Sequence, residues 1–359
     1  MDRRSLMKHA GIAGVLAAGI APAVHAQAAI RWRLASSFPK PLDTIYGGAE
    51  VFAKKVSDMT AGKFQISVHA GGELMPPFGV VDGVQQGSVE MCHTVPYYYF
   101  GKNEAFAIGA AIPFGMNSRQ MSAWMYEGNG RKLMNEFYAK YNMVSFPGGN
   151  TGTQMGGWFR KEIKTVADLK GLKFRIGGFA GKVVERLGVV PQNLPGGEIY
   201  QALEKGTLDA AEWVGPYDDQ KLGFNKVAPF YYYPGWWEGG PEVDFFVNDK
   251  ALAALPAEYR AIIETAASHA HIDMQAKYDA RNPTALKQLV GAKTKILPFP
   301  KPVLDASFKA SMELYAELSE KNPDWKKIYT DYRAFQKDQI LWFRFAESRF
   351  DTYMQSVTL

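Results

Sequence analysis

The chain has 359 residues, of which 47% are hydrophobic and 21% charged, and it carries a formal net charge of +5. This length is sufficient for two domains of ordinary size, and the composition is that of a folded globular protein. The lysine and arginine residues form no continuous stripe, which argues against a nucleic-acid-binding protein, whereas a weakly basic chain agrees with an anionic ligand. A single cysteine, Cys92, excludes an internal disulfide, and we expect it to be a buried thiol within a strand at residues 89–94.

The first 28 residues have the pattern of an export signal. Arg3 and Arg4 precede an apolar run over residues 10–23, and Ala26-Gln27-Ala28 has the form of a cleavage site. The paired arginines are similar to those of a twin-arginine signal. The apolar run is shorter than the roughly 20 residues that a membrane-spanning helix needs. We therefore expect residues 1–28 to be a signal peptide and the rest of the chain to be exported to the periplasm.

The region after the signal peptide alternates between strand and helix patterns. Strands are predicted at 30–36, 63–69 and 89–94, and helices at 41–60 and 80–86. This β-α-β-α-β order is typical of a mostly parallel sheet in an α/β protein. We assign residues 29–150 to a first lobe, to which part of residues 245–300 would return.

The next segments carry the chain into a second lobe at residues 151–245. In chain order we expect a helix at 118–141, a strand at 142–147, a glycine-rich turn at 148–153, and strands at 154–159 and 242–248. From residue 256 to 359 the chain is mainly helical, with predicted helices at 257–290, 302–322 and 325–356 and a short strand at 294–297. The last, aromatic-rich helix packs either on its own lobes or on a second subunit, and the sequence leaves both open.

Residues 167–216 contain the clearest strand–helix–strand pattern. A strand at 173–176 carries Arg175 near its end, and a strand at 207–213 carries Glu212 near its end. Open α/β sheets bind ligands at the carboxyl ends of their strands. The segment from Pro195 to Gly206 also resembles an earlier one from Pro76 to Gly87 at a constant offset. This self-similarity predicts two similar α/β lobes with a ligand cleft between them.

Two charged residues are the main candidates for binding. The guanidinium of Arg175 matches a carboxylate in two parallel hydrogen bonds, although an arginine at a strand end is also commonly a surface residue. Glu212 follows two alanines in an apolar strand and needs a partner, either an Arg or Lys side chain or a cation. Gln154 and the carbonyl of Trp213 are able to complete an all-oxygen site for a hard cation.

Asn150, Tyr98 and Glu238 are further candidates for contacts with ligand oxygens, or alternatively turn and rim residues. His93 occupies the position in the first repeat that matches Glu212, and a lone histidine there is expected to be structural. Motifs of serine hydrolases, zinc proteases and phosphate-binding loops are absent from the sequence. A secreted carboxylate-processing enzyme stays open as an alternative, without a positive motif.

The motifs then point to a family. The chain resembles the solute receptors of tripartite ATP-independent periplasmic (TRAP) transporters, in the branch that binds 2-oxo acids. The resemblance covers essentially all residues after the signal, and its most specific parts are Asp168-Leu169-Lys170-Gly171-Leu172-Lys173-Phe174-Arg175, the segment 198–213 and Tyr233-Pro234-Gly235-Trp236-Trp237-Glu238.

The resemblance implies a two-lobed fold of the periplasmic binding protein type with long C-terminal helices. It also implies a receptor without enzymatic activity that captures a small monocarboxylate such as pyruvate and delivers it to a TRAP membrane permease. A sodium or calcium ion bridges ligand and protein in this branch, and its ligands by position are Gln154, Glu212 and the Trp213 carbonyl. The implied substrate contacts are Arg175, Asn150, Tyr98, Trp213 and Glu238.

The resemblance leaves several questions open. Receptors for lactate or another 2-hydroxy acid belong to the same family, so the acid itself is not fixed. The choice between sodium and calcium is equally open. The closing helices of the family sometimes pair two subunits, so a homodimer is also implied as one arrangement.

Overall fold

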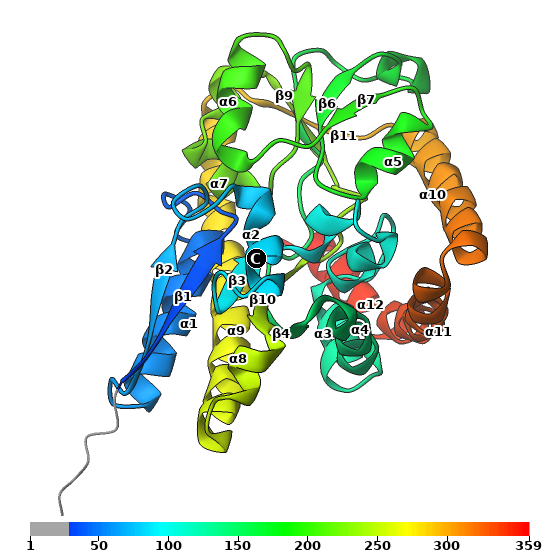
Figure 1. Cartoon of the computed structure of the whole chain (residues 1–359). Helices are drawn as coiled ribbons and strands as arrows, with labels where there is room; N and C mark the ends of the chain where they lie inside the picture. The colour runs from blue at the N-terminus through cyan, green and yellow to red at the C-terminus, as the bar shows by residue number, and fades with distance from the viewer. Residues whose placement is uncertain (1–28, 359) are drawn as a thin grey trace, which may run out of the picture.

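The computed structural model describes residues 29–358, and the predicted signal peptide at 1–28 lies outside these residues. The first of two sheets contains five strands in the order β2-β1-β3-β10-β4 (Figure 1). Their bounds are Ile30–Ser36 (β1), Phe64–His69 (β2), Met91–Thr94 (β3), Met143–Asn150 (β4) and Glu242–Asn248 (β10). The strands β1, β2 and β3 are parallel, whereas β10 pairs antiparallel with both β3 and β4. The expectation of a mostly parallel sheet therefore fails for the strand that returns from the second lobe.

The second sheet has six strands in the order β11-β9-β5-β8-β6-β7. Their bounds are Gly157–Phe159 (β5), Lys173–Arg175 (β6), Val190–Gln192 (β7), Ala210–Ala211 (β8), Phe230–Tyr233 (β9) and Lys295–Pro298 (β11). The strands β6, β7 and β8 are parallel, and β5 runs antiparallel to β8 and β9. Each sheet belongs to one lobe, so the two-lobed α/β fold predicted from the sequence is confirmed.

Helices cover the sheets and connect them (Figure 1). The α-helices of the described chain are Ile45–Met59 (α1), Val80–Gln85 (α2), Ser118–Tyr126 (α3), Gly130–Tyr138 (α4), Ala180–Glu185 (α5), Gly196–Glu204 (α6), Pro216–Lys221 (α7), Asp249–Ala253 (α8), Ala257–Gly291 (α9), Lys301–Lys321 (α10), Pro323–Phe345 (α11) and Glu347–Ser356 (α12). Short 3-10 helices lie at Pro77–Gly79, Pro96–Tyr99, Glu104–Gly109, Ala139–Tyr141, Val166–Leu169 and Phe224–Lys226. Within residues 29–358, none of these helices is both long and apolar enough to cross a bilayer.

The long helix α9 connects the lobes. It packs on α1 and β4 in the first lobe and on α7 of the second, and the chain then continues into β11 of the second sheet. Pro283 lies inside this helix, where its missing N–H removes one helical hydrogen bond. The other crossings between the lobes are the connections from β4 to β5, from β9 to β10 and from α10 to α11, since α10 packs on α5 of the second lobe and α11 packs on α3 and α4 of the first. Four segments of the chain therefore link the lobes.

Two predicted elements differ in length from those of the structure. The turn predicted at 148–153 is partly strand, because β4 runs on through Gly148 and Gly149 to Asn150. A Cβ atom on Gly148 would lie 2.3 Å from the Phe245 ring, and one on Gly149 would lie 2.3 Å from the Met274 side chain. These glycines thus let β4 pack closely against its neighbours. The strand predicted at 207–213 is regular only at Ala210–Ala211, so Glu212 follows the strand directly.

Two predicted helices are interrupted. The helix expected at 118–141 is broken between α3 and α4, where a Cβ atom on Gly128 or Gly130 would lie 2.8 Å from the carbonyl oxygen of Trp124. The helix expected at 325–356 is divided at Ala346 into α11 and α12. Both breaks fall between residues with helical apolar spacing, so periodicity alone did not reveal them.

The internal repeat is present at the level of helix, glycine and strand. Gly87 ends the turn after α2, and Gly206 ends the turn after α6, and both have a φ of +73°. The strands before the helices are arranged differently, because β1 separates β2 from β3, whereas β6 and β8 are neighbours. The repeat therefore describes a local unit, and the two sheets differ in topology.

Candidate functional site

The second sheet places Arg175 and Glu212 side by side. β6 and β8 run parallel with Arg175 opposite Ala211, and the Glu212 amide donates to the Arg175 carbonyl at 3.1 Å. The sequence therefore brings a strand-end arginine and the residue after the next strand to the same edge of the sheet. The two side chains form an ion pair in which both are buried.

Most donors of Arg175 are used within the protein. Its Nε donates to the Leu194 carbonyl at 3.0 Å, and its Nη1 donates to the Glu212 carbonyl at 2.8 Å and to the Glu212 carboxylate. The Gly177 amide donates to the same carboxylate oxygen at 2.5 Å. Only Nη2 of Arg175 is buried without a partner. The guanidinium is therefore held rigidly, with one nitrogen free for a ligand.

Arg175 lines a pocket between the lobes whose cavity volume is only about 10 Å³. A cavity of this size holds about one water molecule, so the pocket walls lie close together. The lining residues come from both lobes and from the segments between them: Phe38, Ile45, Val95, Tyr97, Tyr98, Thr151, Gln154, Arg175, Trp213, Val214 and Pro241. These walls combine a buried guanidinium with apolar side chains, so their chemistry suits a small ligand that has one anionic and one apolar end.

Gln154 and Trp213 supply further unpaired polar atoms to this pocket. The Gln154 side chain donates to the Thr151 hydroxyl at 3.1 Å, and its Oε1 is buried without a partner. The indole Nε1 of Trp213 is also buried and unpaired, and the Trp213 ring lies 5.1 Å from the Arg175 guanidinium carbon. Buried polar atoms normally have partners, so these atoms indicate a site that a ligand completes.

Glu238 adds a second buried carboxylate to the neighbourhood. Its carbonyl accepts a hydrogen bond from the Gln154 amide at 3.1 Å, whereas both of its carboxylate oxygens are buried without a partner. Burial raises the pKa of Glu238 well above its usual range, and the nearby Glu212 carboxylate acts in the same direction. An unpaired buried carboxylate is costly unless a proton or a cation neutralises it.

The other sequence candidates have different surroundings. Tyr98 lies in the pocket wall, and burial raises its pKa to about 12, so it is a neutral donor. Asn150 lies outside the lining, since its amide donates to the Gly240 carbonyl at 3.0 Å and its oxygen accepts from the Gly152 amide at 2.9 Å. This amide fixes the crossing from β4 to β5. His93 is buried in the first lobe against Phe38 and Phe245, as expected for a structural residue.

The oxygen atoms near the pocket fit a hard cation better than a transition metal. Among residues 29–358 there is no group of three or more His, Cys, Asp or Glu side chains that could hold a metal ion. An amide oxygen and a carboxylate are instead the ligand types that sodium and calcium prefer. The unpaired Oε1 of Gln154 and the buried carboxylate of Glu212 are ligand types that such a cation takes, and a cation site formed by Gln154, Glu212 and the Trp213 carbonyl stays a prediction.

Comparison with known proteins identifies the family. The model of the family "bacterial extracellular solute-binding protein, family 7" matches residues 35–322. The chain belongs to this family. It is also 49% identical over 327 residues to a monocarboxylate 2-oxoacid-binding periplasmic protein of Nostoc, a match that covers 91% of this chain and 90% of the relative.

Solved structures of the family superpose closely on this chain. A TRAP transporter solute-binding protein of Bordetella bronchiseptica is 52% identical, with a TM-score of 0.91 and coverage of 92% of this chain and 98% of that chain. It was crystallised as a dimer with calcium and picolinate in one active site. A TRAP solute-binding protein of Pseudoalteromonas atlantica with bound sodium and pyruvate is 41% identical, with a TM-score of 0.88 and coverage of 92% and 100%. The resemblance to TRAP receptors is thus confirmed.

Sequence reasoning for this family member missed the apolar part of the pocket. Phe38, Ile45, Val95 and Val214 line it, yet each lies in a pattern that is equally typical of core residues. Among the pocket residues that the sequence did not predict, only Tyr97 had a sequence feature that could have identified it, because it lies in the same aromatic cluster as Tyr98. The apolar wall could be recognised only once the two lobes were placed together.

Proposed function

We propose that this protein is the periplasmic receptor of a TRAP transporter and that it captures a small 2-oxo acid such as pyruvate for a membrane permease. The observation that carries this proposal is the unpaired Nη2 of a rigid, buried Arg175 in a small pocket with an apolar wall. A carboxylate is the ligand group that such a nitrogen binds best. The Nostoc relative and the pyruvate-bound structure support the same class of ligand.

A cation forms part of this proposal because of the charges around the pocket. Around the pocket, Arg175 is the buried positively charged side chain, and Glu212 and Glu238 are buried acids. A bound carboxylate would add a further negative charge. Gln154, Glu212 and the Trp213 carbonyl would hold a sodium or calcium ion, which would supply the missing positive charge. Sodium and calcium in the related structures support this assignment.

The receptor needs no chemical step. A ligand that contacts Arg175 and Tyr98 from opposite lobes binds the closed form better than the open form, and this difference drives closure. Asn150 and Glu238 would have a structural role at the crossings between the lobes. The Asn150 amide donates to the Gly240 carbonyl and the Glu238 carbonyl accepts from the Gln154 amide, and these bonds would hold the pocket walls in place. The closed protein is then the form that a permease recognises.

The direct test is thermal unfolding of protein without residues 1–28, freed of ligand by unfolding and refolding. We expect pyruvate or a longer 2-oxo acid to raise the melting temperature, and more so with sodium or calcium, because ligands that bind only the folded state stabilise it. Lactate and other 2-hydroxy acids in the same panel decide between the two ligand classes. No shift with any acid would contradict the receptor proposal, and turnover assays would then examine a carboxylate-processing enzyme.

The cation site has its own test in Gln154→Leu. We expect affinity for the acid to fall about tenfold and its dependence on sodium or calcium to weaken, since one oxygen ligand is lost. The melting temperature of ligand-free protein should fall only slightly, because Oε1 has no partner within the protein and the substitution removes a single hydrogen bond, from Nε2 to the Thr151 hydroxyl. Isothermal titration at several cation concentrations measures the effect, with exposed Gln201→Leu as the control. An unaltered cation response in Gln154→Leu would contradict the assignment.

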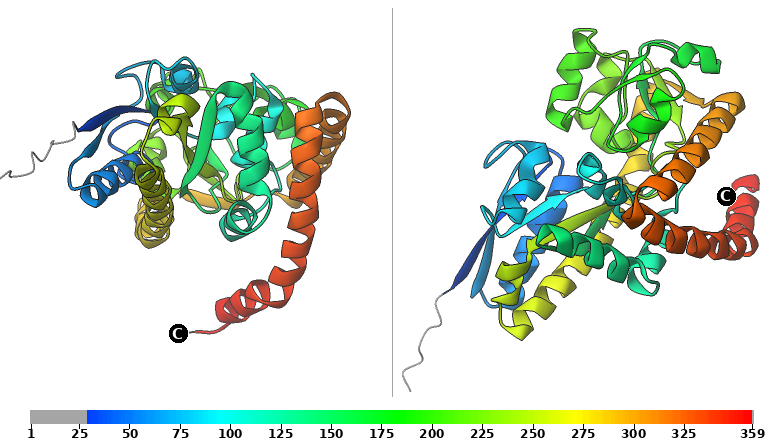
Figure 2. Two further views of the ribbon diagram at one scale, coloured as in Figure 1. Left: turned by 60° about the horizontal axis from the view of Figure 1, so that its bottom comes forward. Right: turned by 45° about the vertical axis from the view of Figure 1, so that its right-hand side comes forward.

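We also propose that two subunits pair through the C-terminal helices. Leu341, Trp342 and Phe345 on α11 and Phe350 and Tyr353 on α12 are between 57% and 73% exposed. Figure 2 shows the C-terminal end of α11 and the whole of α12 extending away from the lobes, and α12 has no buried residue. A large apolar face that its own chain leaves uncovered is typical of a protein interface. The dimeric Bordetella relative supports the pairing.

A further inference from the structure

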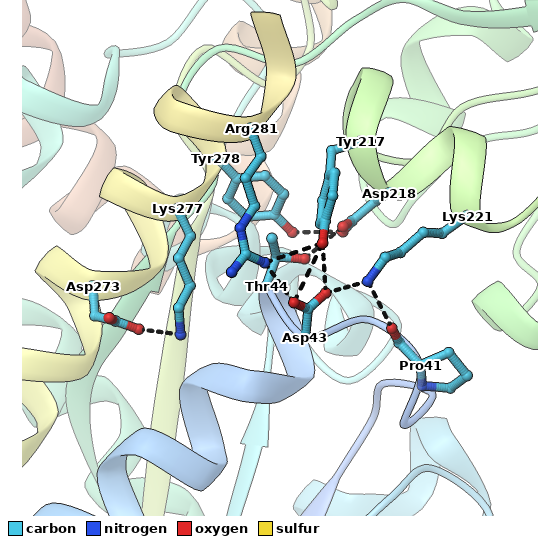
Figure 3. Close-up of polar contacts among 10 residues, drawn as sticks. All are labelled: Pro41, Asp43, Thr44, Tyr217, Asp218, Lys221, Asp273, Lys277, Tyr278 and Arg281. Atoms are coloured by element: carbon cyan, nitrogen blue, oxygen red, sulfur yellow. Dashed lines mark hydrogen bonds and ion pairs between the residues drawn. The ribbon is translucent and has the colours of Figure 1, made fainter. Parts of the chain in front are cut away.

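A cluster of polar contacts joins the lobes beside the pocket, outside the residues that line it (Figure 3). Asp43 and Thr44 precede α1 of the first lobe, whereas Tyr217, Asp218 and Lys221 lie on α7 of the second. Tyr278 and Arg281 of the connecting helix α9 complete the group. We call these seven residues the interlobe latch.

The outer layer of the latch is centred on Asp43. Its carboxylate accepts hydrogen bonds from Tyr217 at 3.1 Å, from Arg281 at 2.5 Å and from Lys221. Lys221 also donates to the Pro41 carbonyl at 3.3 Å. The ammonium of Lys221 lies 4.6 Å and the guanidinium carbon of Arg281 5.1 Å from the centre of the Tyr217 ring. One aspartate of the first lobe thus binds two cations and a hydroxyl group that belong to α7 of the second lobe and to the connecting helix α9.

The inner layer is buried. The Thr44 hydroxyl donates to one oxygen of the Asp218 carboxylate at 2.5 Å, and the Tyr278 hydroxyl donates to the other at 2.7 Å. Thr44, Asp218 and Tyr278 are all fully buried. Separating the lobes would break the bond from Thr44, whereas Tyr278 lies on the connecting helix α9, which packs on α7. The bond between Thr44 and Asp218 therefore favours the closed arrangement.

The latch is directly connected to the pocket through the chain. Ile45, which lines the pocket, follows Thr44, and Val214 of the opposite wall lies just before α7. Asp219 of α7 accepts from the Val214 and Gly215 amides, each at 3.1 Å, so this wall and α7 move as one body. Closure of the lobes would bring Ile45 and Val214 together around a ligand. Because these residues adjoin Thr44 and α7, the same closure would bring Asp43 and Thr44 into contact with α7.

We propose that Asp43 and Thr44 on one lobe, and Asp218 and Lys221 on the other, hold the receptor closed and so set how long it retains its ligand. This inference rests on the proposed function, but it concerns positioning residues that contact no ligand. The latch supplies contacts that exist only in the closed form, and such contacts shift the equilibrium toward that form whether or not a ligand is present. Because the outer layer is partly exposed, salt weakens it and shortens retention.

The test compares Asp43→Asn and Thr44→Val with Asp58→Asn. Asp58 also belongs to α1, but it pairs with Lys54 of the same helix and faces solvent. With pyruvate and calcium, stopped-flow tryptophan fluorescence should show ligand dissociation about tenfold faster in both latch variants, with association changed by no more than about twofold. Dissociation from the Asp58→Asn control should match that of the unaltered protein.

A second measurement needs no ligand. Spin labels on cysteines introduced at the exposed positions Glu50 and Lys161, one in each lobe, report the distance between the lobes, since the native Cys92 is buried. We expect a smaller closed fraction in both latch variants than in the control. Dissociation rates and distance distributions that match the control would together overturn the latch. If the unaltered protein bound no carboxylate, the proposed function would fail, and the distances alone would decide the latch.

Discussion

Arg175 is part of the protein framework and, in the proposed function, also binds the ligand. Two of its nitrogens are bonded to Glu212 and to the Leu194 carbonyl, which fixes the plane of the guanidinium and leaves Nη2 free. Holding this side chain in place before a ligand arrives reduces the entropy that binding costs. The same contacts keep Glu212 paired, so the burial of both charges is compensated inside the protein.

Arg175→Lys therefore separates charge from geometry. Lysine keeps the positive charge near Glu212 but lacks the planar group that reaches three partners and the ligand together. We expect affinity for the carboxylate to fall by at least about tenfold, while the circular dichroism spectrum stays that of a folded protein. Isothermal titration measures the affinity, and Lys173→Ala on the same strand is the control, because Lys173 is exposed. Unchanged affinity in Arg175→Lys would contradict the assignment of this residue to the ligand.

His93 gives a pH dependence that belongs to a single residue. Burial lowers the pKa of His93 to about 3, from an ordinary value of 6.5. Between these values the unfolded chain binds a proton that the folded protein does not, so stability falls as the pH decreases from about 6.5 toward 3. The slope from this group is about 1.4 kcal/mol per pH unit.

Replacing His93 by glutamine should remove that slope. Urea unfolding at pH 7 and pH 5 measures the free energy of unfolding, and the loss between them should be smaller in His93→Gln than in the unaltered protein. His69 is partly exposed on β2 of the same sheet, which makes His69→Gln the control. An equal loss in His93→Gln and in the unaltered protein would show that another group titrates.

At the scale of elements, the helix–glycine–strand unit illustrates how sequence fixes local structure. Gly87 and Gly206 both have a φ of +73°, a region that other residues occupy only with strain. A Cβ atom on Gly87 would meet no atom within 4 Å, so the backbone angle alone requires glycine there. This explains why the glycines at the two equivalent positions could be recognised from the sequence.

Gly87→Ala is accordingly expected to lower the free energy of unfolding by about 1 kcal/mol. Gly101→Ala is the matched control, because Gly101 also has open space around it but has no positive φ. Its stability should change by less than about 0.5 kcal/mol. Chemical denaturation followed by tryptophan fluorescence compares the two variants. Equal effects would show that the left-handed angle is not the source of the cost.

For the whole molecule, the apolar face on α11 and α12 predicts the state of association. Trp342→Glu combined with Phe345→Glu places two charges on this face, and we expect the dimer to dissociate to monomers because a charge buried there would lack a partner. Sedimentation equilibrium measures the mass, and Ile272→Glu, at an isolated exposed site of α9, is the control. Ligand affinity should stay unchanged, since these side chains are absent from the pocket lining. A protein that is monomeric before any substitution would contradict the pairing.

The sequence by itself determined the two-lobed α/β class, the family, and most strands and helices to within a few residues. The fold class and the elements could be predicted because alternation, helical periodicity and turn glycines are local properties. The bounds of α9 and β10 followed from such patterns almost unchanged. The family followed instead from the resemblance carried by residues 168–175, 198–213 and 233–238.

Only the tertiary structure decided which atoms are free and which are used. Asn150 and Gln154 both carry amides in the same crossing segment, yet the first is fully bonded and the second leaves an oxygen unpaired. The apolar pocket wall and the contact of Asp43 with Lys221 likewise join residues that are far apart in the chain. Hydrogen bonds and packing depend on atomic positions in three dimensions, and residue spacing along a sequence does not specify them.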